Sequence, residues 1–290
     1  MKKLYTLILS VTFAFTVDAQ LSLTKAFNEP IVGDVNTKLG FDSVGVVPKN
    51  TGPAQTWNFS AYTANTVTAI STYTTVASTP SAASFPLATI AEDSGNGTFS
   101  YFTATASTFE LNGIALNGGI AITFTNNAIA AQWPVVYLYS NTDTYSGSAT
   151  TPVGSGNANV TMTTTAPGNG TIMLPGGQTF TNVLQVKSVN NLIATVGTFP
   201  TAATISIVST DYTYYTGTQK FPVLTVSYSK QTLTSLAGPT VTSTASIRIN
   251  NAVYSGINEL TLDNSYSIYP NPASGQFNVS LDNAKSENVS

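Results

Sequence analysis

The sequence predicts an all-β protein: an antiparallel β-sandwich ectodomain, formed as one large or two packed sandwiches. Between residues 20 and 258, short runs rich in Thr, Val, Ile, Tyr and Phe are separated by Gly, Pro, Asn and Ser, a composition typical of strands and turns. Apolar and hydroxyl side chains alternate over residues 223–230, which predicts one buried and one wet face, as in an antiparallel sheet. No stretch of ten residues combines a helical period with a cap.

The expected strands follow one another in series and are divided by turn sequences. Gly combined with Asn or Pro marks turns at residues 95–97, 167–170 and 174–177. Many short antiparallel strands in series favour a sandwich. The expected strands are residues 66–76, 98–111, 119–125, 135–139, 159–165, 170–174, 182–189, 204–216, 222–232 and 241–249.

The composition excludes several kinds of chemistry. The 290 residues contain no His and no Cys, and only 8% of them are charged. A Ser–His–Asp triad, a thiol nucleophile, a disulfide framework and a zinc or haem site with the usual ligands are therefore excluded. We expect no cofactor and no metal, and the inventory favours a protein that binds over one that catalyses.

The N-terminus has the pattern of a secretory signal peptide. Met1-Lys2-Lys3 is followed by an apolar run from residue 4 to 17, and Val17 and Ala19 fit the −3 and −1 positions of a cleavage site before Gln20. The run is shorter than the roughly 20 residues that cross a bilayer, which makes a membrane anchor the weaker alternative. The mature chain is expected to be acidic, with no transmembrane segment and no affinity for nucleic acid.

The C-terminus carries a second candidate targeting motif. Tyr269-Pro270-Asn271-Pro272 lies between two expected short strands, and Gly275, Phe277, Val279 and Leu281 follow it at fixed spacing. The simpler interpretation is a terminal β-hairpin, since Pro and Asn are ordinary turn residues.

The same residues closely resemble the opening of the type A sorting domain of Bacteroidetes type IX secretion substrates. The resemblance implies that the type IX machinery is a partner, and that the protein is released or attached to the outer cell surface. The family's domain continues with further strands and a basic tail, whereas this sequence ends at Ser290. We therefore expect a truncated sorting domain.

A looser set of landmarks runs through residues 25–230. It comprises EPIVGD at residues 29–34, GPAQTWNFS at 52–60, FP at 85–86, NVLQVK at 182–187 and FPVL at 221–224. The set is similar to an abundant group of secreted Bacteroidetes proteins in which a β-rich ectodomain precedes a sorting domain. It implies a location and a fold class, and no activity.

These features divide the chain into four expected parts. Residues 1–19 are a signal peptide, 20–250 the ectodomain, 251–264 an exposed polar linker, and 265–290 the truncated sorting domain.

Trp133, Tyr212 and Tyr214 are the candidates for a surface that stacks on a glycan. Tyr212 and Tyr214 share one face of an expected strand, and Trp133 lies beside a turn signal. The alternative for all three is ordinary packing, which is the commoner use of such rings in a β-protein. Trp57 alternates with Phe59 and is assigned to the core.

Two functions remain open from the sequence. The first is a secreted or surface-attached protein without enzymatic activity, with adhesion or glycan or polymer binding as its role. The alternative is a secreted polysaccharide hydrolase, which needs two facing carboxylates roughly 5–10 Å apart. An ice-binding surface ranks last, because no Thr repeat recurs at a fixed period. The carboxylates considered for the hydrolase are Glu29, Asp34, Glu92, Glu110 and Asp143.

Overall fold

The computed structural model describes residues 20–151, 154–196, 203–235, 238–254, 266–269 and 278–281. Almost all of the regular structure is β, with three short helical turns: α1 (Lys25–Asn28), η1 (Val76–Ser78) and η2 (Ala82–Ser84). The strands are β1 (Val35–Phe41), β2 (Gly52–Asn58), β3 (Ala64–Thr74), β4 (Ile90–Asp93), β5 (Phe99–Ala104), β6 (Thr108–Leu116), β7 (Ile120–Gln132), β8 (Ser140–Thr151), β9 (Gly154–Met173), β10 (Thr179–Val196), β11 (Ala203–Tyr215), β12 (Leu224–Ser235), β13 (Gly238–Asn250), β14 (Tyr266–Tyr269) and β15 (Asn278–Leu281).

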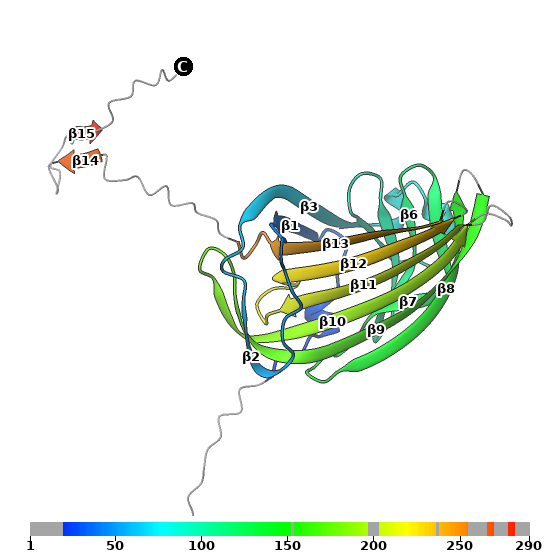
Figure 1. The fold of residues 1–290 in the computed structure, drawn as a ribbon, viewed down its shortest axis with the longest axis horizontal. Coiled ribbons are helices and arrows are strands. Elements are labelled where there is room, and N and C mark those ends of the chain that lie inside the picture. Colours follow the sequence, from blue (N-terminus) through cyan, green and yellow to red (C-terminus); the bar gives the residue numbers. More distant parts are fainter. Residues whose placement is uncertain are drawn as a thin grey trace, which may run out of the picture. The chain divides into compact units, whose positions relative to one another are not determined.

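Twelve strands form one closed antiparallel barrel (Figure 1). Strands β3 to β13 pair consecutively, each with the next along the chain, and β1 pairs with both β13 and β3. The ring therefore closes through β1, where Leu39 lies opposite Ile249 on one side and Thr68 on the other. A closed barrel leaves no free edge among its ring strands.

The prediction of a β-sandwich is wrong. Alternation along a strand shows that one face is apolar and the other polar, but it does not show whether the sheet curls until its first and last strands pair. Closure depends on β1 (Val35–Phe41), a segment that the sequence analysis did not predict as a strand.

Contacts between strands that are not neighbours identify the inner face. Phe221, in the loop between β11 and β12, stacks on Tyr73 of β3 with ring centroids 5.7 Å apart. In the sheet, β12, β13 and β1 lie between β11 and β3. The contact between Phe221 and Tyr73 therefore crosses the interior of the barrel. Tyr73 packs with Phe102 and Phe109 in an apolar cluster on the same face.

The largest apolar cluster lies on the outer face, beneath residues 42–62. Trp57 and Phe59 of this segment pack with Leu224, Val226 and other buried side chains of β9 to β13 and β1. In Figure 1 the blue segment after β1 crosses in front of the ends of β10 to β12. The apolar side chains of β12 therefore point outward under a cover, and its hydroxyls point into the barrel.

Strand β2 holds this cover in place by pairing in parallel with the end of β9. The approach requires Gly170, where an added Cβ would lie 1.9 Å from the carbonyl oxygen of Gln55. Only glycine permits two backbones to come this close. Trp57 is 1% exposed and donates its indole N–H to the Asn50 carbonyl at 2.8 Å, as expected for a core residue.

Other differences from the expected strands are local. The sequence analysis did not predict β1, β2, β4 or β8. Residues 135–139 form a turn in which Val135 makes an isolated bridge with Leu23. The expected strand at 98–111 is two strands, because the Thr105 hydroxyl accepts hydrogen bonds from the N–H groups of Ser107 and Thr108 and forms a turn.

The chain separates into two compact units, residues 1–254 and 255–290. Residues 251–254 of the expected linker belong to the first unit: Val253 is buried, and the Tyr254 ring meets Phe41 edge-on at 5.2 Å. In the second unit β14 and β15 pair antiparallel, with Tyr269 opposite Asn278. The expected signal peptide with its cleavage residue Ala19, the rest of the linker, and motif residues 270–277 lie outside the described residues.

Candidate functional site

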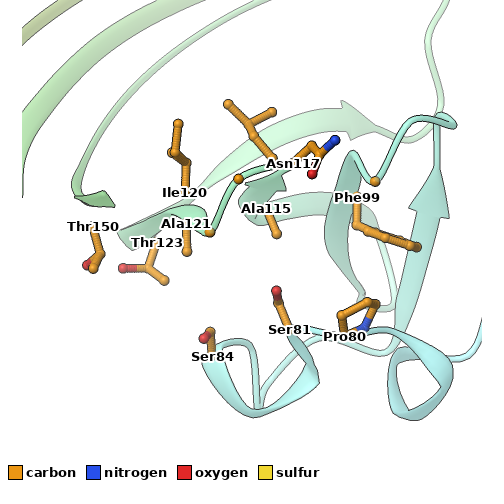
Figure 2. Close-up of a pocket in the computed structure, with 14 residues that line it drawn as sticks. Pro80, Ser81, Ser84, Phe99, Ala115, Asn117, Ile120, Ala121, Thr123 and Thr150 are labelled. Carbon is orange, nitrogen blue, oxygen red and sulfur yellow. The ribbon is translucent and has the colours of Figure 1, made fainter. Parts of the chain in front are cut away.

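A groove of about 510 Å³ lies on the outer face of the barrel, between η2 and strands β6 to β8. Figure 2 shows Ala115, Ala121 and Thr123 facing Ser81 and Ser84 across it. The volume falls within the range of small-ligand sites, roughly 300–1,000 Å³. The groove is lined by Pro80, Ser81, Ser84, Gly97, Phe99, Ala115, Leu116, Asn117, Gly118, Gly119, Ile120, Ala121, Thr123 and Thr150.

Strand register places one wall of the groove. Ala115 lies opposite both Phe99 and Ala121, and Ala121 lies opposite Thr150. Directly opposed residues share a face of the sheet, so these four side chains line up across β5 to β8. The turn that ends this wall needs Gly118 and Gly119, whose φ angles are +86° and +77°.

Packing of the loop between β3 and β4 places the other wall. Phe85, which follows η2, stacks on Tyr101 of β5 with ring centroids 4.0 Å apart. A Cβ at Gly113 would lie 2.4 Å from the Phe85 ring and 2.2 Å from the Ile122 carbonyl oxygen, so this glycine makes room for the ring. The Tyr101 hydroxyl also donates to Thr79 at 2.8 Å. These contacts hold Ser81 and Ser84 over β6 and β7.

The chemistry of the groove is neutral and rich in hydroxyl groups. None of its 14 lining residues is ionisable. Within the part of the chain that the structure describes, the hydroxyls of Ser81, Ser84 and Thr150 have no hydrogen-bond partner, whereas the Thr123 hydroxyl meets that of Ser148 at 3.3 Å. Free hydroxyls beside the ring of Phe99 and the side chain of Leu116 suit a neutral ligand with hydroxyls and apolar faces.

The inner face of the barrel carries charged groups instead. Tyr73 donates a hydrogen bond to Glu92, and Ser227 donates one to Asp211. Burial raises the pKa of Tyr73 and of Asp211 and lowers the pKa of Lys38, which the charges of Glu92 and Asp211 partly restore. Among the residues described, Lys38 has no hydrogen-bond or ion-pair partner. The interior thus combines charged and hydroxyl groups with the apolar clusters around Tyr73 and Trp133.

The structure separates Trp133 from Tyr212 and Tyr214. Tyr212 is 6% and Tyr214 0% exposed, both beneath residues 42–62. Tyr214 meets Trp57 edge-on at 5.0 Å and its hydroxyl accepts from the Gln185 amide at 3.1 Å. Their rings are therefore packed and are not free to stack on a ligand. Trp133 is half-buried on the inner side, with Val135, Leu184 and Val186.

Each of the five carboxylates considered for a hydrolase takes part in a local contact, and none lines the groove. Glu29 and Asp34 lie in the stretch between α1 and β1, and the other three come from β4, β6 and β8. Glu29 pairs with Lys25, Asp34 with Lys220, Glu92 accepts from Tyr73, Glu110 from Thr108 and Asn127, and Asp143 from the N–H of Ile129. These contacts give the carboxylates structural roles.

The sequence analysis missed the groove residues. The Asn117-Gly118-Gly119 turn between two alternating runs could have indicated the hairpin of β6 and β7. Ser81 and Ser84 lie in an irregular segment with no periodic pattern, so nothing in the sequence relates them to β7.

No group of three or more acidic, His or Cys side chains that could hold a metal occurs among the described residues. In the same part of the chain, no helix is long and apolar enough to cross a membrane. Comparisons with protein families, with curated proteins and with solved structures found no match.

Proposed function

We propose that this protein is a secreted or surface-attached binding protein, without enzymatic activity, that holds a neutral glycan or similar hydroxyl-rich polymer in the groove of β6 to β8. The observation that carries the proposal is a set of three hydroxyls, on Ser81, Ser84 and Thr150, that line one uncharged groove and have no hydrogen-bond partner among the described residues. A sugar ring offers matching hydroxyls on its edge and an apolar face for Phe99 and Leu116.

The position of the groove supports a polymer as the ligand. It lies on the outer face of a closed barrel, where a polymer can reach it from solvent. Rigid strands form one wall, so the site is largely formed before binding and little ordering is required. The proposal of export and surface location rests on the N-terminal and C-terminal sequence motifs.

A glycan array supplemented with pull-downs on insoluble polysaccharides tests the proposal. We expect saturable binding to one or more neutral glycans and none that requires charged sugars. Replacing exposed Thr150 by Trp fills the groove and should weaken binding at least tenfold, which corresponds to about 1.4 kcal/mol.

Thr142→Trp is the matched control. Thr142 is also exposed, lies on the same strand β8 and the same outer face, and does not line the groove. The Thr142→Trp variant should bind glycan as tightly as the unsubstituted protein does. Uniform failure to bind, or equal binding by the Thr150→Trp variant, would leave the groove without this function.

A further inference from the structure

A second pocket, of about 150 Å³, lies on the inner side of the barrel and is separate from the groove. Its residues come from the neighbouring strands β9, β10 and β11, from the end of β7 and the segment that follows it, and from Leu23 near the start of the described chain. Leu23 and Val135 form its bridge-paired edge. The pocket is lined by Leu23, Ile129, Ala130, Ala131, Gln132, Trp133, Val135, Tyr139, Thr164, Val186, Ser188, Thr213 and Tyr215.

The walls of this pocket are mostly apolar and include three aromatic rings and three aliphatic hydroxyls. Trp133, Tyr139 and Tyr215 are half-buried, so part of each faces open space. The hydroxyls of Thr164 and Ser188 lie 3.3 Å apart, and the Thr213 hydroxyl donates to the Val186 carbonyl. Burial raises the pKa of both Tyr139 and Tyr215, which keeps the two phenols neutral.

The indole N–H of Trp133 is an unpaired donor at this pocket. Its Nε1 atom is buried and has no hydrogen-bond partner among the residues that the structure describes. Buried side-chain donors are almost always paired, and an exception calls for a partner that the protein itself does not supply. By contrast, the only other indole N–H, on Trp57, donates to a carbonyl oxygen.

We propose that this inner pocket binds a neutral molecule of about the size of one six-membered ring that carries a hydrogen-bond acceptor, with the acceptor taking the N–H of Trp133. A cavity of about 150 Å³ holds a benzene-sized molecule. The three rings and the side chains of Leu23 and Val186 contact the ring of the ligand. A carbonyl, ether or hydroxyl oxygen pairs the orphan donor.

The indole signals of an ¹⁵N-labelled sample test this proposal, because the chain has two tryptophans. Trp133→Phe assigns the signals by removing one of them. Cyclohexanone is the probe with an acceptor, and cyclohexane is the matched probe without one. We expect cyclohexanone to move the Trp133 N–H signal downfield in a saturable way and to leave the Trp57 signal in place, whereas cyclohexane should produce no downfield shift.

Two variants separate a specific site from a general solvent effect. Ser188→Val narrows the pocket and removes one of its hydroxyls, and it should weaken the shift, while an unchanged Trp57 signal shows that the fold is intact. Thr163→Val changes a similar side chain on the outer face of the adjacent strand β9 and should leave the shift unchanged. Absence of a saturable shift, equal movement of both indole signals, or an unaltered response in Ser188→Val would overturn the proposal.

Discussion

The ring of Phe221 lies parallel to that of Tyr73, with planes 8° apart and centroids 5.7 Å apart. This stack joins the loop between β11 and β12 to strand β3 on the far side of β1. Lys220 beside it pairs with Asp34, and its carbonyl accepts a hydrogen bond from the Asn28 amide at 3.1 Å. The loop between β11 and β12 therefore contacts β3 and residues 28–34, none of which pairs with β11 or β12 through backbone hydrogen bonds.

Replacing Phe221 by Ala should destabilise the barrel by about 2 kcal/mol, since a half-buried aromatic side chain and a ring pair are both lost. Urea unfolding followed by circular dichroism measures the change. Val241→Ala, at an exposed position on β13, should stay within about 0.5 kcal/mol. Equal stability of the two variants would mean that the cross-barrel contact does not contribute.

Replacing Gly113 by Ala should both destabilise the protein and weaken glycan binding. The new methyl group would displace Phe85, which positions the loop that carries Ser81 and Ser84. We expect a loss of about 1–3 kcal/mol, as for other overpacked sites, measured by urea unfolding together with the binding assay.

The control for this change is Gly217→Ala. Its Cβ would meet only Leu21, at an ordinary contact distance of 3.5 Å. It should bind normally and keep its stability within about 0.5 kcal/mol. If Gly113→Ala behaved in the same way, Phe85 would not hold the groove wall.

Stability should fall as the pH rises above 10. Burial raises the pKa of Tyr145 and of Tyr228 to about 12, and raises that of Tyr73 and Tyr214 as well. A tyrosine with a raised folded-state pKa contributes stability that is complete below its unfolded value of 10.0 and is lost as the pH rises through the folded value.

Lys38 acts in the opposite direction, because its folded-state pKa lies below 10.5. The contribution of Lys38 increases up to that pH, but it is one group against six tyrosines, because the pKa values of Tyr139 and Tyr215 are raised as well. Unfolding free energies between pH 8 and 11.5, with tyrosinate absorbance recorded in parallel, check the net sign. A stability that stayed level to pH 11.5 would show that the tyrosines titrate freely in the folded state.

Export in a bacterial host should remove residues 1–19 and leave Gln20 as the first residue. The positive n-region and apolar run are the features that a signal peptidase substrate needs. Intact mass spectrometry of the exported chain detects the cut. Ala19→Arg should block it, and an uncut chain held in the membrane fraction would favour the anchor instead.

The presence of strands and their alternation could be predicted from the sequence. Two features could not: that the sheet closes into a barrel, and which face of each strand points into it. The apolar and hydroxyl faces of β12 are as expected. Leu224 nevertheless points outward, because residues 42–62 cover it, and no local sequence pattern predicts that cover. β1 closes the ring, and its segment does alternate, with Val35, Thr37, Leu39 and Phe41 on one face and Asn36, Lys38 and Gly40 on the other. This strand could therefore have been predicted, but its pairing with both β13 and β3 could not. Ser84 and Thr150 line the same groove because segments distant in the sequence pack together. The periodicity of a sequence carries no information about such packing.

The most direct test of the central claim is a titration of the ¹⁵N-labelled protein with a neutral oligosaccharide that is positive on the array. Binding in the groove predicts saturable shifts of backbone amides at Ser84, Gly118, Gly119 and Thr150, with the same dissociation constant for each. It also predicts their loss in Thr150→Trp and their retention in Thr142→Trp. Saturable shifts confined to other surfaces, or none at the groove, would contradict the claim.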